Sequence, residues 1–136
     1  MASDSIAESG LSVVLLNKGQ ALDAFDCGDA DLNDFLKADA FSYDEKAIAK
    51  TYVCLYENLP VGFFSICADA IRLSYAERET EFGKQKVHSD YPALKIARLA
   101  VAKSVQNKGV GSYLVKLVLG KAFSLSEQIG CRFVTV

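Results

Sequence analysis

The stretch that decides the fold is the apolar strand Leu94–Val101, LKIARLAV, followed by Gln106-Asn-Lys-Gly109-Val-Gly111. A helix with an apolar stripe begins at about Val110. The first turn of a helix leaves its backbone N–H groups without intrahelical partners, and the helix dipole favours a negative group there. Glycines also let a ligand approach the backbone closely. A strand, a glycine-bearing loop and a helix N-terminus in this order therefore predict an anion site.

Two common phosphate-binding motifs do not fit this loop. The dinucleotide fingerprint G-x-G-x-x-G follows its strand directly, whereas here Leu114 stands in place of the third glycine and the connection 102–108 is long. No window matches the P-loop pattern G-x-x-x-x-G-K-[ST]. Taken alone, Gly109 and Gly111 also suit an ordinary loop-to-helix turn. An unrelated α/β nucleotide-binding module, which NAD or ATP would stabilise, stays open as an alternative.

The pattern that does fit belongs to a family. Arg98-Leu-Ala-Val101, four further residues and then Gln106-x-x-Gly109-x-Gly111 resemble the acyl-CoA-binding core of the GNAT N-acetyltransferases. Segments further towards the N-terminus are similar to one GNAT subgroup, which includes the acetyltransferase toxins of bacterial toxin–antitoxin pairs. These segments are Phe25-Asp-Cys-Gly28, Asp31-Leu-Asn33, Phe35-Leu36 and Thr51-Tyr-Val53.

This resemblance implies a fold and a cofactor. The expected fold is α/β (α+β), with a mixed, mostly antiparallel twisted sheet and helices on both faces, over residues 12–136 after a polar tail of residues 1–11. The expected cosubstrate is acetyl-CoA, whose pantetheine arm lies beside the central strand while loop amides hold the pyrophosphate. The residues implied in cofactor binding are Leu99, Ala100, Val101, Gln106, Asn107, Lys108, Gly109, Val110, Gly111 and Ser112.

The implied activity is transfer of an acetyl group from acetyl-CoA to a primary amine. The toxin subgroup suggests aminoacyl-tRNA as the acceptor and an antitoxin protein as a partner. A base or water chain must take the amine's proton, and a fixed backbone N–H must stabilise the oxyanion. The family's acid is a tyrosine, but Tyr52, Tyr56 and Tyr113 do not occupy its position, so no catalytic residue is assigned. The alternative is an inactive CoA-binding or protein-interaction remnant.

The last residues, Arg132-Phe-Val-Thr-Val136, form an apolar, β-branched strand at which the chain stops. Family members continue with a helix and two strands. We therefore expect a GNAT-like domain that is truncated after its fifth strand, or one that another chain completes. An exposed sheet edge invites pairing, so the sequence predicts a homo-oligomer or poor solubility.

Composition excludes several other classes of protein. The chain of 136 residues, 51% hydrophobic and 24% charged, is typical of one globular domain. No apolar run reaches the roughly 18 residues that span a bilayer, and the polar segment Met1–Gly10 is no signal peptide, so a cytoplasmic protein without membrane contact is expected. The four cysteines form no C-x-x-C pair and His88 is the only histidine, so neither a metal nor a Cys–His catalytic pair has support.

Charge is distributed unevenly along the chain. The net charge is −2, but residues 93–136 contain seven basic residues and the single acid Glu127, which gives +6 there and −8 in residues 1–92. The positive part coincides with the predicted anion site, and Lys108 lies inside it. Net acidity speaks against RNA binding, which needs many Lys and Arg contacts, whereas the basic C-terminal third keeps RNA open as a partner.

The remaining patterns predict the other elements of the domain. Strand 12–17 precedes a helix that Asp29 or Asp31 caps. Strands 50–56 and 61–68 form a hairpin through turn 57–60, and Gly62 indicates a bulge or a close backbone approach. The charged insert 69–91 reads as a short helix plus loop, and it is either an acceptor-side lid or a solvated connector.

Two details concern the central strand and the helix after it. In a regular strand, Leu94 and Ile96 would face one side of the sheet, and Leu99 and Val101 would face the other. A bulge near Ala97–Arg98 is therefore expected, unless the strand is buried on both faces. The helix from Val110 is expected to run towards Gly130, and close packing is the one reason that suggests itself for Gly120. Its stripe consists of Val110, Leu114, Leu117, Val118, Ala122, Leu125 and Ile129.

Overall fold

Five strands form one sheet in the computed structural model, which describes residues 5–84 and 88–136. The order is β1-β2-β3-β4-β5, with antiparallel pairing from β1 to β4 and parallel pairing of β5 with β4. This confirms the predicted mixed, mostly antiparallel sheet. The strands are β1 (Leu11–Leu15), β2 (Lys50–Tyr56), β3 (Leu59–Arg72), β4 (Asp90–Val101) and β5 (Phe133–Thr135).

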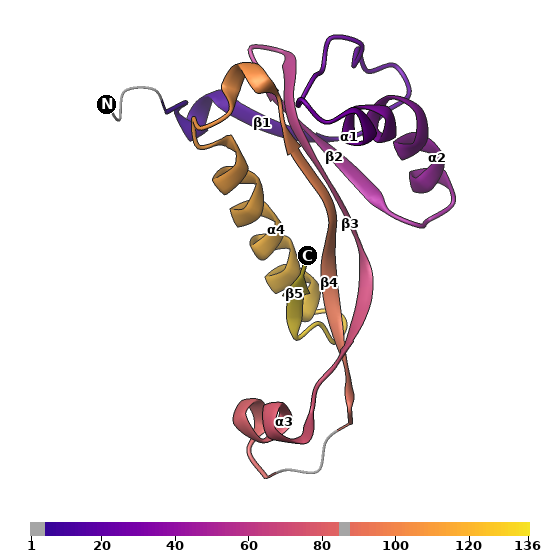
Figure 1. The fold of residues 1–136 in the computed structure, drawn as a ribbon, viewed down its shortest axis with the longest axis vertical. Coiled ribbons are helices and arrows are strands. Elements are labelled where there is room, and N and C mark those ends of the chain that lie inside the picture. The colour runs from indigo at the N-terminus through magenta and orange to yellow at the C-terminus, as the bar shows by residue number, and fades with distance from the viewer. Residues whose placement is uncertain (1–4, 85–87) are drawn as a thin grey trace.

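Helices cover both faces of the sheet, as predicted (Figure 1). The long helix α4 lies on one face, and a continuous helical segment made of α1, η3 and α2 lies on the other. The elements of that segment are α1 (Ala30–Asp34), the π-helical η3 (Phe35–Asp39) and α2 (Ala40–Glu45); the other helical elements are η2 (Glu8–Gly10), α3 (Tyr75–Phe82), η4 (Lys103–Val105) and α4 (Val110–Ser126).

Each helical layer buries the apolar face that its sequence carries. Of the two predicted caps, Asp29 is the one used, because its carboxylate accepts a hydrogen bond from the Leu32 N–H at 3.1 Å. Phe35 and the Phe63 ring of β3 stack at 6.2 Å between ring centroids, which joins the α1–α2 segment to the sheet. On the opposite face, α4 buries residues at a spacing of four, namely Val110, Leu114, Val118 and Ala122.

The predicted bulge in the central strand is confirmed at Ala97. Ser65 pairs with Arg98 while the next residue of β3, Ile66, pairs with Ile96, so Ala97 is the extra residue. Side chains of both parities therefore reach the same face. Leu94, Ile96, Leu99 and Val101 all pack in the cluster beneath α4.

The β2–β3 hairpin is confirmed with a tighter turn than predicted. Glu57 and Asn58 both have positive φ angles, 52° and 64°, so the turn consists of these two residues and β3 begins at Leu59. Both interpretations of Gly62 hold. The register shifts next to it, and a Cβ there would lie 3.1 Å from the Ala100 carbonyl oxygen and 3.2 Å from Leu114 Cδ1.

The insert 69–91 is less irregular than predicted. Its two ends belong to the sheet, because β3 continues to Arg72 and pairs there with Asp90 at the start of β4. Between them, α3 begins at a capping box of Ser74 and Glu77. The paired strands carry α3 away from the rest of the domain (Figure 1). The lid prediction includes residues 85–87, which lie outside the described residues.

Two predictions about α4 are wrong. The helix ends at Ser126, and Ile129 is 61% exposed, because the Gln128 and Ile129 N–H groups both bond to Leu125 O in a terminal turn. That turn brings the chain back to β5 beside β4. Gly120 is not a site of close packing either, because a Cβ at this position would meet nothing within 4 Å.

Candidate functional site

The predicted anion loop connects β4 to α4 and lines a cavity of about 410 Å³. Most of the predicted cofactor-binding residues meet there, and Leu99, Ala100 and Lys108 are the ones that do not line it. The lining residues are Val101, Val105, Gln106, Asn107, Gly109, Val110, Gly111 and Ser112.

The backbone of this loop is arranged to present N–H groups. Asn107 and Gly109 both adopt the left-handed conformation, with φ angles of 64° and 90°. Gly109 O accepts the first α4 hydrogen bond, from the Tyr113 N–H at 3.1 Å. The N–H groups of residues 110–112 precede that bond and so have no intrahelical acceptor. Because these residues line the cavity, the cavity is a suitable place for a phosphate.

The two glycines of the loop have different physical roles. A Cβ on Gly109 would meet nothing within 4 Å, so the positive φ angle, and not a lack of space, favours glycine there. Gly111 has ordinary helical geometry, and a Cβ there would lie 3.8 Å from Val101 Cγ2. Val101 also lines the cavity. Gly111 therefore keeps space open for a ligand.

The edge of β4 next to this cavity is open. β5 pairs only with Ala93–Lys95, and in the described part of the chain no strand covers that edge beyond Lys95. The Ala102 N–H donates to Val61 O of β3 at 2.8 Å. Because N–H directions alternate along a strand, those of Val101 and Leu99 face the open edge. Ala100 has its carbonyl near Gly62 of β3 and its side chain in the opposite core, so the structure does not bring it to the cavity.

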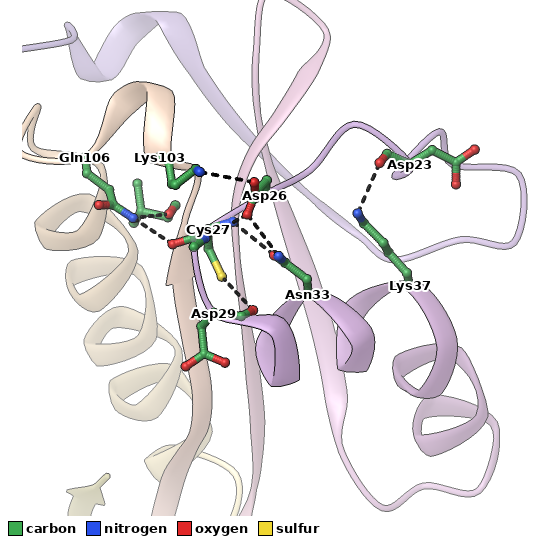
Figure 2. A network of polar contacts seen from close by, with 10 residues as sticks. Asp23, Asp26, Cys27, Asp29, Asn33, Lys37, Lys103 and Gln106 are labelled. Carbon is green, nitrogen blue, oxygen red and sulfur yellow. Dashed lines mark hydrogen bonds and ion pairs between the residues drawn. The ribbon is translucent and has the colours of Figure 1, made fainter.

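The side chain of Gln106 is held by hydrogen bonds within the protein (Figure 2). Its Nε2 donates to Cys27 O at 3.0 Å and to Val101 O at 2.9 Å, and its backbone N–H donates to Lys103 O at 3.5 Å. Gln106 therefore shapes the loop by holding it against β4 and the Cys27 segment.

The Cys27 segment is itself held by Asn33 of α1 (Figure 2). Asn33 Oδ1 accepts from the Cys27 N–H at 2.9 Å, and Asn33 Nδ2 donates to Asp26 Oδ1 at 3.0 Å. The hydrogen bonds from Asn33 and from the Gly28 N–H lower the pKa of the Asp26 carboxyl below its usual value. Sequence reasoning missed this network, although its residues lie in the N-terminal segments on which the subgroup resemblance was based.

The comparisons with known proteins fit this geometry. The sequence pattern of the acetyltransferase (GNAT) family matches residues 22–136. The chain belongs to the GNAT acetyltransferase family. The GNAT chain is 23% identical over 113 residues to the "tRNA-acetylating toxin" of Mycobacterium tuberculosis (strain ATCC 25618 / H37Rv). That match covers 83% of the chain and 66% of the relative's length. The predicted family is thus confirmed, and the relative agrees with the predicted toxin subgroup.

Solved structures confirm the predicted fold. "AtaT complexed with acetyl-methionyl-tRNAfMet" has a TM-score of 0.81 at 22% identity, and the match covers 91% of the GNAT chain and 75% of AtaT. "AtaTR bound with AcCoA" has a TM-score of 0.76 at 22% identity, covering 93% and 76%. The "KacTA-DNA complex" has a TM-score of 0.72 at 23% identity, covering 91% and 72%.

Most basic side chains of the GNAT chain's positive C-terminal third already have partners. Lys103, Lys116 and Arg132 form ion pairs with Asp26, Glu8 and Glu81 at 3.1–3.4 Å. Lys121 and Arg98 lie over the rings of Tyr52 and Phe35, at 4.1 and 3.8 Å from the ring centroids. Within residues 5–84 and 88–136, Lys108 forms no ion pair. The α4 dipole and the unpaired charge of Lys108 therefore both make the loop region positive, although Lys108 does not line the cavity.

Neither Cys54 nor Tyr113 is activated by its surroundings. Burial raises the pKa of the Cys54 thiol to about 11 and also raises the pKa of Tyr113. Across the described residues, no three His, Cys, Asp or Glu side chains gather in a way that suits a metal ion. None of the described helices combines the length and apolar character that crossing a bilayer requires.

Proposed function

We propose that this chain transfers the acetyl group of acetyl-CoA to the primary amine of an aminoacyl-tRNA. The observation that carries the proposal is the position of the anion loop directly beside the open, bulged edge of β4. The loop N–H groups of residues 110–112 suit the pyrophosphate. The edge N–H groups of Leu99 and Val101 suit the amide groups of a pantetheine arm, which would extend the sheet.

The expected chemistry is direct attack of the amine on the thioester carbonyl. A C–N bond forms, the C–S bond breaks, the amine loses a proton, and coenzyme A departs as a thiolate that takes up a proton. The bulge at Ala97 interrupts the ladder with β3, and a backbone N–H released from such a ladder is suited to stabilising the oxyanion. We assign no catalytic acid or base.

Support for the acceptor and partners comes from the relatives. One relative is a tRNA-acetylating toxin, and AtaT was solved with acetyl-methionyl-tRNAfMet. A Y144F mutant of AtaT was solved with the C-terminus of the antitoxin AtaR. The chain spans 66% of the length of that curated toxin, so these properties are proposals for the whole protein. On the same basis we propose an antitoxin partner. We also propose a cytoplasmic location, because the proposed acceptor, aminoacyl-tRNA, is used in that compartment.

Cofactor binding is tested by isothermal titration calorimetry. Acetyl-CoA is expected to bind much more tightly than S-acetyl-pantetheine, which carries the thioester but no pyrophosphate. Equal affinity for the two compounds would contradict pyrophosphate binding at the loop. Stabilisation by NAD or ATP with no response to acetyl-CoA would replace the proposal by the nucleotide-binding alternative.

Turnover is tested by release of the coenzyme A thiol with charged methionyl-tRNA, and uncharged tRNA serves as the control. Thiol release is expected with the charged tRNA but not with the uncharged tRNA, and the product should contain N-acetylmethionine. Tight binding of acetyl-CoA without thiol release for any amine acceptor would instead support the inactive, CoA-binding remnant.

A further inference from the structure

A chain of hydrogen bonds joins helix α1 to the anion loop, although the two lie far apart in the sequence (Figure 2). It runs from Asn33 to Asp26 and Cys27, and from Cys27 to Gln106. We call these four residues the Asn33 brace. The chemistry proposed above gives no role to the side chains of these residues.

The brace fixes where the loop leaves β4. Two groups of the loop donate hydrogen bonds to neighbouring backbone carbonyls. The Lys103 N–H donates to Asp26 O at 2.8 Å, and Gln106 Nε2 donates to Cys27 O at 3.0 Å. Gln106 Nε2 also bonds to Val101 O at 2.9 Å. The carbonyl groups of Asp26 and Cys27 therefore fix the position of the loop, and Gln106 connects them to the end of β4.

Asn33 holds the Asp26–Cys27 backbone in place through both the oxygen and the nitrogen of its side-chain amide. Its Oδ1 accepts from the Cys27 N–H at 2.9 Å, and its Nδ2 donates to Asp26 Oδ1 at 3.0 Å. The same Asp26 oxygen accepts from the Gly28 N–H at 2.8 Å. An aspartate at position 33 keeps the acceptor but loses the donor, and it brings a second carboxylate against Asp26. Alanine loses both bonds.

We infer that Asn33 is a positioning residue for acetyl-CoA, which acts through Asp26, Cys27 and Gln106 to hold the loop amides ready for the pyrophosphate. The inference rests on the proposed function. A loop that is already ordered does not lose conformational entropy when the ligand binds, so its affinity is higher than that of a loose loop with the same contacts. The brace begins at the start of the α1–α2 segment, so it also ties the cofactor loop to the helical layer on the other face of the sheet.

The test compares three variants by calorimetry with acetyl-CoA. Asn33→Asp is expected to raise the Kd about tenfold, from the loss of one charge-assisted hydrogen bond and the new repulsion. Asn33→Ala removes both bonds without adding a charge, so it is also expected to raise the Kd. Lys37→Met is the matched control, because Lys37 on the same helical segment bonds to Asp23 O at 3.0 Å and does not reach the loop.

Several results would overturn the inference. These are an unchanged Kd in Asn33→Asp, an unchanged Kd in Asn33→Ala, or an equal loss of affinity in Lys37→Met. Gln106→Met offers a second route, because Gln106 is exposed and the substitution removes both Nε2 bonds without entering the core. It too is expected to raise the Kd, and an unchanged Kd in this variant would equally contradict the brace.

A second readout separates this inference from the proposed function. In the ligand-free protein, hydrogen exchange at the Lys103 and Tyr113 amides is expected to be faster in Asn33→Asp, while exchange at Val118 in the core of α4 is unchanged. If the wild-type protein does not bind acetyl-CoA, the proposed function fails, and this measurement still decides whether Asn33 orders the loop. Equal exchange at Lys103 and Tyr113 in both proteins would show that it does not.

Discussion

At the scale of single residues, substitutions of the two loop glycines are expected to affect different properties, stability at Gly109 and ligand affinity at Gly111. Gly109→Ala is expected to destabilise the protein by about 1 kcal/mol, because the φ angle of 90° is unfavourable for a residue with a Cβ. Gly111→Ala is expected to keep or raise stability, by up to about 1 kcal/mol, because alanine is the better helix former. Its methyl group nevertheless takes up space in the cavity, so affinity for acetyl-CoA should fall. Urea unfolding measures the stability of both variants, and calorimetry measures their affinity for acetyl-CoA. Full affinity in Gly111→Ala would argue against a ligand at this helix end.

The Asp26 carboxyl is expected to make the free energy of unfolding depend on pH in a defined direction. Its pKa is lowered in the folded state by the Asn33 and Gly28 hydrogen bonds, so the charged carboxylate stabilises the fold above the ordinary value of 3.8. This contribution is lost as the pH falls below 3.8 and through the lowered pKa. Asp26→Asn should therefore lower the free energy of unfolding at pH 7, and the difference from wild type should shrink at pH 3. Asp34→Asn, an exposed position in α1, is the control. A difference that is the same at both pH values would contradict this role.

At the scale of elements, α4 offers a matched pair of leucines. Leu114 is fully buried under the helix, whereas Leu119 on the other side is 51% exposed. Leu114→Ala is expected to cost about 3 kcal/mol, from lost burial and the cavity that remains. Leu119→Ala should change stability by less than about 0.5 kcal/mol. Both replace leucine by alanine in one helix, so helix propensity cancels, and urea unfolding at low protein concentration measures the difference. Similar costs at the two positions would mean that α4 is not packed as described.

The elements also show how far sequence reasoning reaches. The bulge at Ala97 was predictable, because a strand that changes the parity of its apolar residues needs one extra residue to keep them on one face. The loop before α4 was predictable from its two glycines. The hydrogen bond between Gln106 and Cys27, which are 79 positions apart, was not, because only tertiary structure brings them together. The end of α4 before Ile129 was missed because the apolar period continues past the turn that stops the helix.

At the scale of the whole molecule, three of the seven basic side chains in residues 93–136 form ion pairs, and two lie over aromatic rings. Lys108 at the loop does neither within the described residues. Lys108→Gln is expected to weaken acetyl-CoA binding about fivefold at low salt, which corresponds to about 1 kcal/mol for a partly exposed charge pair. Lys116→Gln, whose lysine pairs with Glu8 at 3.1 Å, should have little effect. The effect of Lys108→Gln should also fade as ionic strength rises. Titrations between 50 mM and 500 mM salt measure both trends, and equal losses in the two variants would point to a general field instead of a local contact.

The surface of α4 bears on the predicted association of the whole chain. Val115, Leu119 and Phe123 recur every four residues and are 39%, 51% and 71% exposed, so they form one apolar stripe on the outer side of the helix. Contiguous apolar surface of this kind favours association, and β5 adds an edge strand nearby. Light scattering on a size-exclusion column should therefore show a mass that rises with protein concentration. Phe123→Lys should shift that transition to higher concentration, whereas Leu59→Lys, which changes a residue 63% exposed near the β2–β3 turn, should not. A constant monomer mass for the wild-type chain at every concentration would contradict the prediction.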